Sequence, residues 1–326
     1  MQRASVLTKI LPGKSGDKDK KSSVRSERLR LAYKKTRRTW KLFRSNRLGI
    51  LGFLMLISFI VMAIIAQPLH ALGLISDPND LRESINPGRE LEPPSAEHLL
   101  GTDEKGRDVI SDLFYGCTAT LIVGFAAALL TIVFGSSVGL LAGASGKIAD
   151  EVLMRTTDLF LVIPWLPLAI ILAAFLPPKG EPAMLKVIFV IGVTSWPATA
   201  RIVRSQVLSI KERSYIERAV CLGSSRLHIM RVHLLPNVFP LIFANAIISV
   251  AWAILSAAFL AFLNLTDPNK ITWGLMIYNA FDVEGFGAGA WWFVLPPGIL
   301  IVLVVLGFTF VSYALDDILN PKLRRR

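Results

Sequence analysis

Residues 214–240 read SYIERAVCLGSSRLHIMRVHLLPNVFP, a charged stretch with three arginines and Glu217 between two long apolar runs. A helix over 205–222, a corner at Gly223 and a second short helix closed by Pro236 are predicted here. Glycine favours the left-handed turn that ends a helix, and proline lacks the N–H that continues one. The apolar runs on either side therefore decide what kind of protein presents this segment.

Those apolar runs dominate the composition of the chain. Of its 326 residues, 53% are hydrophobic and 18% are charged, with a mean hydropathy of +0.53. An ordinary soluble domain carries about a quarter charged residues. A helix of about 20 apolar residues crosses ~30 Å of hydrocarbon. Six blocks have that length, so we predict an all-α polytopic membrane protein with six transmembrane helices: 48–67, 114–141, 159–176, 185–203, 238–263 and 292–313.

Lysine and arginine are unevenly distributed over the segments between these blocks. With the N-terminus inside, the inner segments 1–47, 142–158, 201–233 and 322–326 carry 16, 2, 7 and 4 of them. The outer segments carry 4, 2 and 1. Because cytoplasmic loops are enriched in these residues, both termini are predicted to be cytoplasmic and the acidic loop 68–112 extracytoplasmic. The net charge of +12 thus indicates topology, and nucleic acid is not expected as a partner.

The two ends of the chain are predicted to be basic cytoplasmic tails. Residues 1–46 form the first, and from about residue 29 their apolar positions recur at helical spacing among cations. Such a helix lies along an anionic membrane surface, so lipid is an expected partner. The six-helix domain is predicted over 47–318, and residues 319–326 form the second tail.

Small residues and prolines mark two of the blocks. Gly135, Gly139 and Gly143 recur every four residues in the second block, a spacing that lets helices approach closely in lipid, so they are predicted to serve helix packing. In the third block, Pro164 and Pro167 each remove a backbone hydrogen bond, and a bend is predicted there.

Near the start of the third block, Arg155 and Asp158 are three residues apart. Oppositely charged side chains at this spacing are neighbours on a helix surface. We therefore predict an ion pair within that helix.

Phosphate-binding loops and catalytic motifs are missing from the sequence. The pattern G-x-x-x-x-G-K-[ST] fails at Gly13, which has Thr8 in place of the first glycine, and at Gly146, where Ile148 follows the lysine. Residues 135–139 match the letters Gly-Xaa-Ser-Xaa-Gly but lie inside an apolar block, without the strand-to-helix turn of a nucleophile elbow, and no His-Glu-x-x-His motif or carboxylate pair within an apolar block is present. We expect a non-catalytic chain that binds no cofactor or metal of its own.

The stretch YIERAVCLGSSRLHIMRVHLLPN resembles the cytoplasmic coupling loop of ABC-importer permeases, E-A-A, three residues, G, about nine residues, then I/H-x-L-P. LFRSNRLGILG, LGTDEKGRDVISDLFYG and SAAFLAFLNLTDPNKITWGLMI match the second permease subunit of the dipeptide/oligopeptide class in the same order. The resemblance covers residue 36 or so to the end. It implies a type I ABC importer permease fold with a coupling loop over 204–236.

The resemblance also assigns roles by position. Glu217, Ala219 and Gly223 match the motif, Arg218 stands where the family commonly has alanine, and Pro236 belongs to its closing L-P. It implies that this loop docks onto an ATPase subunit that binds ATP and Mg²⁺. The implied partners are a homologous second permease, two ABC ATPase subunits and an extracytoplasmic solute-binding protein, assembled in the plasma or inner membrane.

The segment GTDEKGRD, residues 101–108, precedes the second block on the predicted outer side. Its glycines suit tight turns, while Asp103, Arg107 and Asp108 can pair with one another or cap the coming helix. Two interpretations stay open: a purely structural loop, or a contact surface for the binding protein or the sister permease.

Taken together, the patterns predict a permease that forms half of a translocation pathway for peptides or related small solutes. Oligosaccharides or nickel are alternatives, because AFLNLTDP at 261–268 lacks two glycines of the family pattern S-F-L-G-L-G. An ion-coupled secondary transporter is a rival of another class. It would need a membrane-embedded relay of ionisable residues or broken helices in repeated halves, and the sequence shows neither. A membrane-anchored enzyme is a third alternative. It is disfavoured because the sequence shows no catalytic constellation.

Overall fold

The computed structural model describes residues 37, 40–78, 85–176, 183–283, 287 and 289–319. These residues separate into two units, the first ending at Arg47 and the second beginning at Leu48. In the first unit a helical segment covers residues 40–45. The start of the amphipathic helix predicted from residue 29 lies outside the described residues, as does the tail predicted over 320–326.

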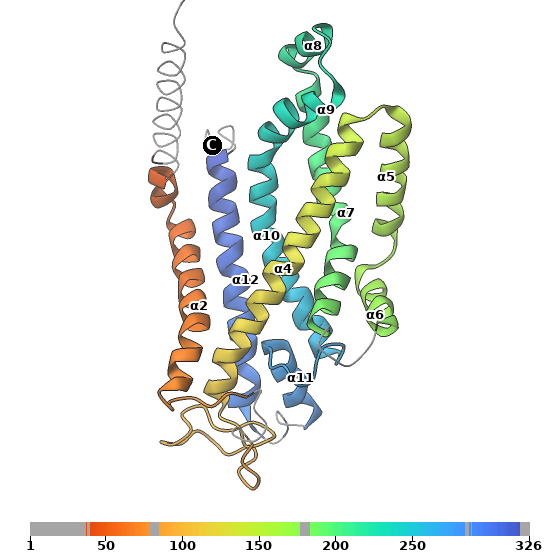
Figure 1. The fold of residues 1–326 in the computed structure, drawn as a ribbon. Coiled ribbons are helices and arrows are strands. Elements are labelled where there is room, and N and C mark those ends of the chain that lie inside the picture. The colour runs from red at the N-terminus through yellow and green to blue at the C-terminus, as the bar shows by residue number, and fades with distance from the viewer. Residues whose placement is uncertain are drawn as a thin grey trace, which may run out of the picture. The chain divides into compact units, whose positions relative to one another are not determined.

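Most of the rest of the described chain is helical, and the bounds of its helices follow in chain order (Figure 1). They are α2 (Arg47–Ala71), α4 (Val109–Ala144), α5 (Lys147–Val162), α6 (Trp165–Phe175), α7 (Ala183–Lys211), α8 (Ser214–Cys221), α9 (Arg226–His228), the π-helix η1 (Ile229–Leu234), α10 (Leu235–Phe262), α11 (Trp273–Asp282) and α12 (Trp291–Leu319).

Five helical runs of the described chain are long and apolar enough to cross a membrane. They are α2, α4, α7, the continuous run from α9 through η1 to α10, and α12. The helices α5 and α6 make a sixth candidate if they form one bent span. The all-helical membrane architecture predicted from the apolar blocks is therefore confirmed, with five or six spans.

The third predicted block is a broken helix. Its two halves, α5 and α6, meet at 92°. Ile163, between them, has the extended backbone that a following proline favours, and Pro164 caps α6. Pro167 lies in the first turn of α6, where the missing N–H leaves no helix hydrogen bond unmade. Only Pro164 therefore produces the predicted bend, and the bend is a complete break.

The ion pair predicted between Arg155 and Asp158 is wrong. Asp158 instead accepts a hydrogen bond from the Arg201 guanidinium of α7 at 2.6 Å. One turn further along α7, Arg204 binds both oxygens of Asp150 at 2.6 Å each. The acidic residues of α5 thus find partners across the helix interface, and the two pairs hold α5 against α7.

α4 packs most extensively against α7, through three glycines. A Cβ atom added at Gly135, Gly139 or Gly143 would stand 2.5 to 2.6 Å from an atom of α7. Real Cβ atoms do not approach so closely, so the α7 backbone comes as near to α4 as glycine permits. Figure 1 shows α4 crossing over α10 and α7 along this contact.

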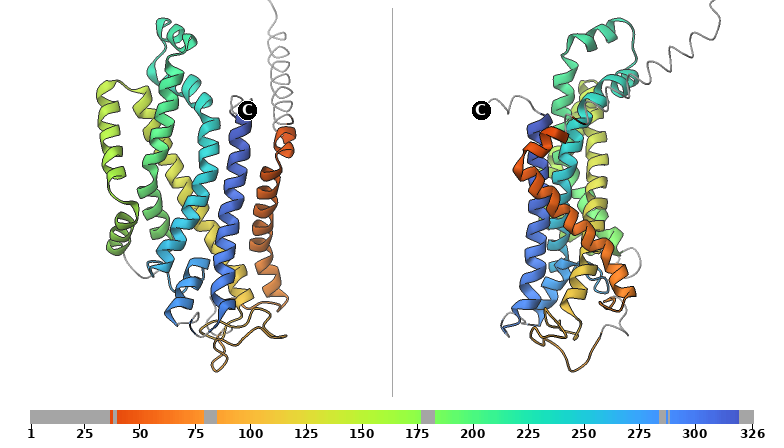
Figure 2. Two further views of the ribbon diagram at one scale, coloured as in Figure 1. Left: turned by 180° about the vertical axis from the view of Figure 1, so that it is seen from behind. Right: turned by 90° about the vertical axis from the view of Figure 1, so that its left-hand side faces the viewer.

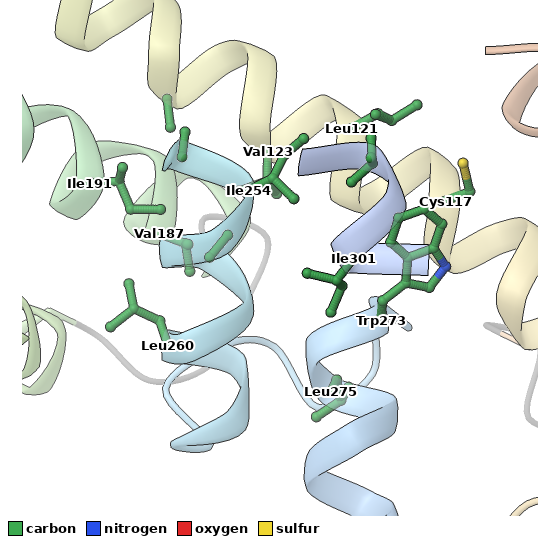
Figure 3. Close-up of a cluster of buried hydrophobic side chains, with 14 of the residues drawn as sticks. Cys117, Leu121, Val123, Val187, Ile191, Ile254, Leu260, Trp273, Leu275 and Ile301 are labelled. Atoms are coloured by element: carbon green, nitrogen blue, oxygen red, sulfur yellow. The ribbon is translucent and has the colours of Figure 1, made fainter. Parts of the chain in front are cut away.

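Two large clusters of buried apolar side chains join the helices. The larger joins α4, α7, α10, α11 and α12, and Trp273 of α11 lies fully buried within it, beside Cys117 and Leu121 of α4 (Figure 3). The indole N–H of Trp273 donates to the Leu113 carbonyl at 3.0 Å, which fixes α11 across the base of α4. The smaller cluster lies at the other end of α7 and continues into α8 and η1.

Candidate coupling site

In the segment predicted to couple, residues 205–236, α8 projects past the ends of α4 and α5 (Figures 1 and 2). α7 ends at Lys211, and a break at residues 212–213 separates it from α8, so the single helix predicted over 205–222 is wrong. The Lys211 ammonium donates to the Gly143 carbonyl at 2.8 Å, where it caps the last turn of α4. This bond anchors the end of α7 immediately before the chain turns into α8.

The corner predicted at Gly223 is present. The Gly223 backbone has φ +82°, in the left-handed region that favours glycine. Its N–H donates to the Val220 carbonyl at 2.9 Å, and the Ser224 N–H donates to the Ala219 carbonyl at 3.0 Å. This pair of bonds is the Schellman motif, which satisfies the last carbonyls of α8 and ends the helix.

Pro236 does not close the second helix, contrary to the prediction. The chain runs from α9 through the π-turn η1 into α10 without a break, and Pro236 lies in the first turn of α10. The Leu235 N–H donates to the Met230 carbonyl five residues back. This widened turn accommodates the proline, and the Asn237 side-chain amide donates to the His233 carbonyl at 2.6 Å.

One face of this segment is buried and the other is exposed. Ile216 of α8 and Ile229 of η1 are buried in the smaller apolar cluster, which holds α8 in place. Glu217 and Arg218 are exposed, and Ala219 is half-buried. Exposed apolar side chains accompany these charges: Val220 at 56%, Leu222 at 86%, Leu227 at 49% and Val232 at 50%. Apolar side chains gathered beside charges are typical of a surface that binds a partner.

The second predicted site, residues 101–108, is organised around a buried ion pair. The Arg107 guanidinium donates to Asp103 at 2.6 Å, and the Arg107 backbone N–H donates to the other oxygen of the same carboxylate at 2.7 Å. These two residues are only 3% and 0% exposed. Asp108 caps α4 by accepting from the Ser111 N–H at 2.9 Å, as predicted. Asp103 and Arg107 thus shape this loop from inside.

Two further carboxylates face the same guanidinium. Asp112 lies 3.5 Å and Glu104 3.7 Å from Arg107. Burial, and then the charge of Asp103, raise the pKa of Glu104 above its ordinary value. Glu104 also accepts a hydrogen bond from the Asn279 amide of α11 at 2.8 Å. The loop is thereby tied to α11, a link that the charges in LGTDEKGRDVISD did not reveal because Asn279 lies far along the chain.

A family model described as the binding-protein-dependent transport system inner membrane component matches residues 135–325. The chain belongs to this family of permeases. A second model, the N-terminal TM domain of oligopeptide transport permease C, matches residues 35–94.

Relatives of this permease cover nearly its whole length. It is 36% identical over 289 residues to the dipeptide transport system permease protein DppC of Alkalihalophilus pseudofirmus, which covers 88% of this chain and 90% of the relative. It is 33% identical over 297 residues to the oligopeptide transport system permease protein OppC of Bacillus subtilis, covering 90% and 92%.

A solved structure shows a similar fold. An inward-facing form of the MetNI methionine ABC transporter gives a TM-score of 0.50 at 20% identity, over 65% of the permease and 95% of the compared chain. At this level of identity the likeness concerns the fold alone, which is that of an ABC importer permease.

Sequence reasoning missed the contacts that position the coupling segment in the permease. The Lys211 bond to Gly143 and the Arg204 bond to Asp150 join residues more than fifty positions apart. In the sequence, these contacts are indicated only by charged residues at the ends of apolar blocks. Such charges do not show which residue each one contacts.

Proposed function

We propose that this permease forms one half of the membrane pathway of an ABC importer for dipeptides or oligopeptides. The observation that carries the proposal is the match over nearly the whole chain to DppC and OppC, named as dipeptide and oligopeptide transport permeases. Oligosaccharides and nickel, as well as ion-coupled transport, gain no support from these relatives. The chain itself is a transport component, and we propose that two partner ATPases bind ATP and Mg²⁺.

Energy would enter through the coupling segment. Glu217, Arg218, Ala219 and Gly223 lie on or beside α8, whose outer face presents charge next to exposed apolar side chains. A short helix of this kind suits a groove on a partner protein. Pro236 lies in the run from α9 through η1 to α10, which contains no loop, so movement of α8 and its corner would pass along this run to a membrane helix.

The proposed topology counts α5 and α6 as one broken span, which makes six, within a membrane domain over 47–318. The protein then lies in the plasma or inner membrane. Both of its termini and α8 lie on the cytoplasmic side. The segment 101–108 lies outside, where it would meet the solute-binding protein or the homologous second permease. Since Asp103 and Arg107 are buried, they would support that contact by holding the loop's shape.

Purification and uptake test the function. Gentle detergent extraction of this permease is expected to bring a second permease and ATPase subunits with it. Cells that lack the chain should lose ATP-dependent uptake of radiolabelled dipeptide and regain it when the chain is supplied. Recovery of the permease alone, with peptide uptake undiminished in its absence, would contradict the proposal.

Labelling of cysteine tests the topology. The chain has two cysteines, of which Cys221 is exposed beside α8 and Cys117 is buried. A membrane-impermeant maleimide is expected to label Cys221 in inside-out vesicles and not in intact spheroplasts. As the matched control, Ser95→Cys on the exposed outer loop in a Cys221→Ser background should label with the opposite preference. Labelling of Cys221 in intact spheroplasts would place the coupling segment on the wrong side.

A further inference from the structure

A cavity of about 380 Å³ lies among four parts of the helical unit: α4, the junction of α5 with α6, α7 and α10. Sites for small molecules usually measure about 300 to 1,000 Å³, so the cavity is large enough for a small peptide. Its wall contains the last turn of α5 before the break at Pro164, and it contains Pro197 in the middle of α7. Two parts of its wall therefore contain or adjoin a proline that removes a backbone hydrogen bond.

Three buried polar atoms on this wall have no hydrogen-bond partner among the described residues. They are the hydroxyls of Thr131 and Ser195 and the indole N–H of Trp165. Other hydroxyls in the apolar helices bond back to a carbonyl of their own helix, for example those of Ser137 and Thr309 at 2.7 Å. A buried polar group without a partner costs about 1 to 3 kcal/mol. Three of them around one cavity indicate that something else satisfies them.

The two ends of the cavity differ. Toward the coupling segment, the Asn245 amide of α10 donates to the Thr199 hydroxyl of α7 at 3.0 Å. Toward the opposite end, the rings of Trp165 and Trp252 meet edge to face at 5.8 Å. Leu161, Ile191 and Ile248 add apolar wall between these ends.

We propose that this cavity is a transient site for the backbone of a peptide in transit, an inference that rests on the proposed function. None of the described residues that line the cavity is charged, so it suits neutral hydrogen-bonding groups. Hydroxyls can donate and accept, and the Trp165 N–H donates. An amide unit offers one acceptor and one donor, which matches this set, and every peptide carries it whatever its side chains.

The apolar walls favour a peptide over an oligosaccharide. A sugar presents hydroxyl groups on most of its edges. Against leucine and isoleucine side chains, many of these hydroxyls would have no hydrogen-bond partner. A peptide alternates amide units with side chains, and apolar side chains can lie against Leu161, Ile191 and Ile248 while the amide meets Thr131 and Ser195. Such a site would accept varied sequences and release them easily, as a transport pathway requires.

Uptake by the complete transporter tests the site. The double variant Thr131→Val/Ser195→Ala removes two unpartnered hydroxyls with little change of shape, and it is expected to slow uptake of radiolabelled trialanine about tenfold. Stimulation of ATP hydrolysis by the loaded binding protein should stay within about twofold of the wild type. Ser136→Ala is the matched control, because its hydroxyl is also buried and unpartnered in α4 but lies off the cavity. Equal effects of the control and the double variant, or no effect of either, would overturn the inference.

Photo-crosslinking identifies the occupant. Benzoylphenylalanine at Ile248, which lines the cavity, is expected to capture radiolabelled trialanine during ATP hydrolysis. The same group at Phe239, exposed on the same helix and away from the cavity, should capture none. Capture of radiolabelled maltotriose in place of the peptide, or capture at neither position, would overturn the assignment. Failure of the wild-type transporter to take up trialanine at all would instead contradict the proposed function. Failure of the proposed site and failure of the proposed function are thus distinguishable.

Discussion

Replacement of Arg107 by leucine is expected to prevent stable folding of the permease. Arg107 lies among Asp103, Glu104 and Asp112 and is the cation that faces Asp103 and Asp112, which are fully buried. Removal of one partner of a buried ion pair costs about 3 to 5 kcal/mol, because the remaining charges have no compensation. The loop that holds the start of α4 and contacts α11 would lose its organising centre. The measurement is the amount of folded protein in the membrane and its melting temperature in detergent.

Arg89→Leu is the matched control for this experiment. Arg89 also pairs with a carboxylate of the same loop, Glu97 at 2.8 Å, but these side chains are 36% and 68% exposed. An exposed pair contributes about 1 kcal/mol or less, so this variant should fold normally. Arg107→Lys keeps the charge but loses the planar guanidinium geometry. Its melting temperature should lie between those of Arg107→Leu and Arg89→Leu. Wild-type stability of Arg107→Leu would show that the buried cluster is unimportant for the fold.

The sequence predicted the helices of this permease well because hydrocarbon thickness fixes the length of an apolar run. It predicted their ends less well. The second block was expected to begin at residue 114, yet α4 begins at Val109, because Asp108 caps a first turn that contains the polar residues Ser111 and Asp112. A helix start predicted from apolar residues alone omits a first turn of polar residues, even where the preceding loop buries that turn.

Local patterns failed where a distant partner decides the outcome. Arg155 and Asp158 have the spacing of an intrahelical pair, yet Arg201 on another helix takes Asp158. Pro236 has the residue type that ends helices, yet a π-turn accommodates it. The cavity was not predicted, because its lining comes from five helices and its signal is the lack of a partner for Thr131 and Ser195.

Gly223→Val is expected to abolish the stimulation of ATP hydrolysis by substrate in the assembled transporter. Valine is strongly disfavoured at the φ of +82° that Gly223 adopts, so the corner after α8 would have to change. A Cβ at this position would meet nothing within 4 Å, so the helices themselves have no reason to shift. The variant should keep the melting temperature of the wild type within a few degrees while its ATP hydrolysis stays at the basal rate.

A valine substitution at a second glycine is the control that distinguishes a change in the backbone of the corner from the addition of a side chain. Gly146, in the turn between α4 and α5 at the same end of the helices, also has nothing within 4 Å, but its φ is −76°. Gly146→Val should therefore leave stimulation intact. Glu217→Lys changes only the charge of the exposed face of α8, and loss of stimulation in this variant too would assign the effect to docking. If Gly223→Val retained full stimulation, α8 could not be the element through which the ATPases move this permease, because the substitution alters the turn that joins α8 to the run leading into α10.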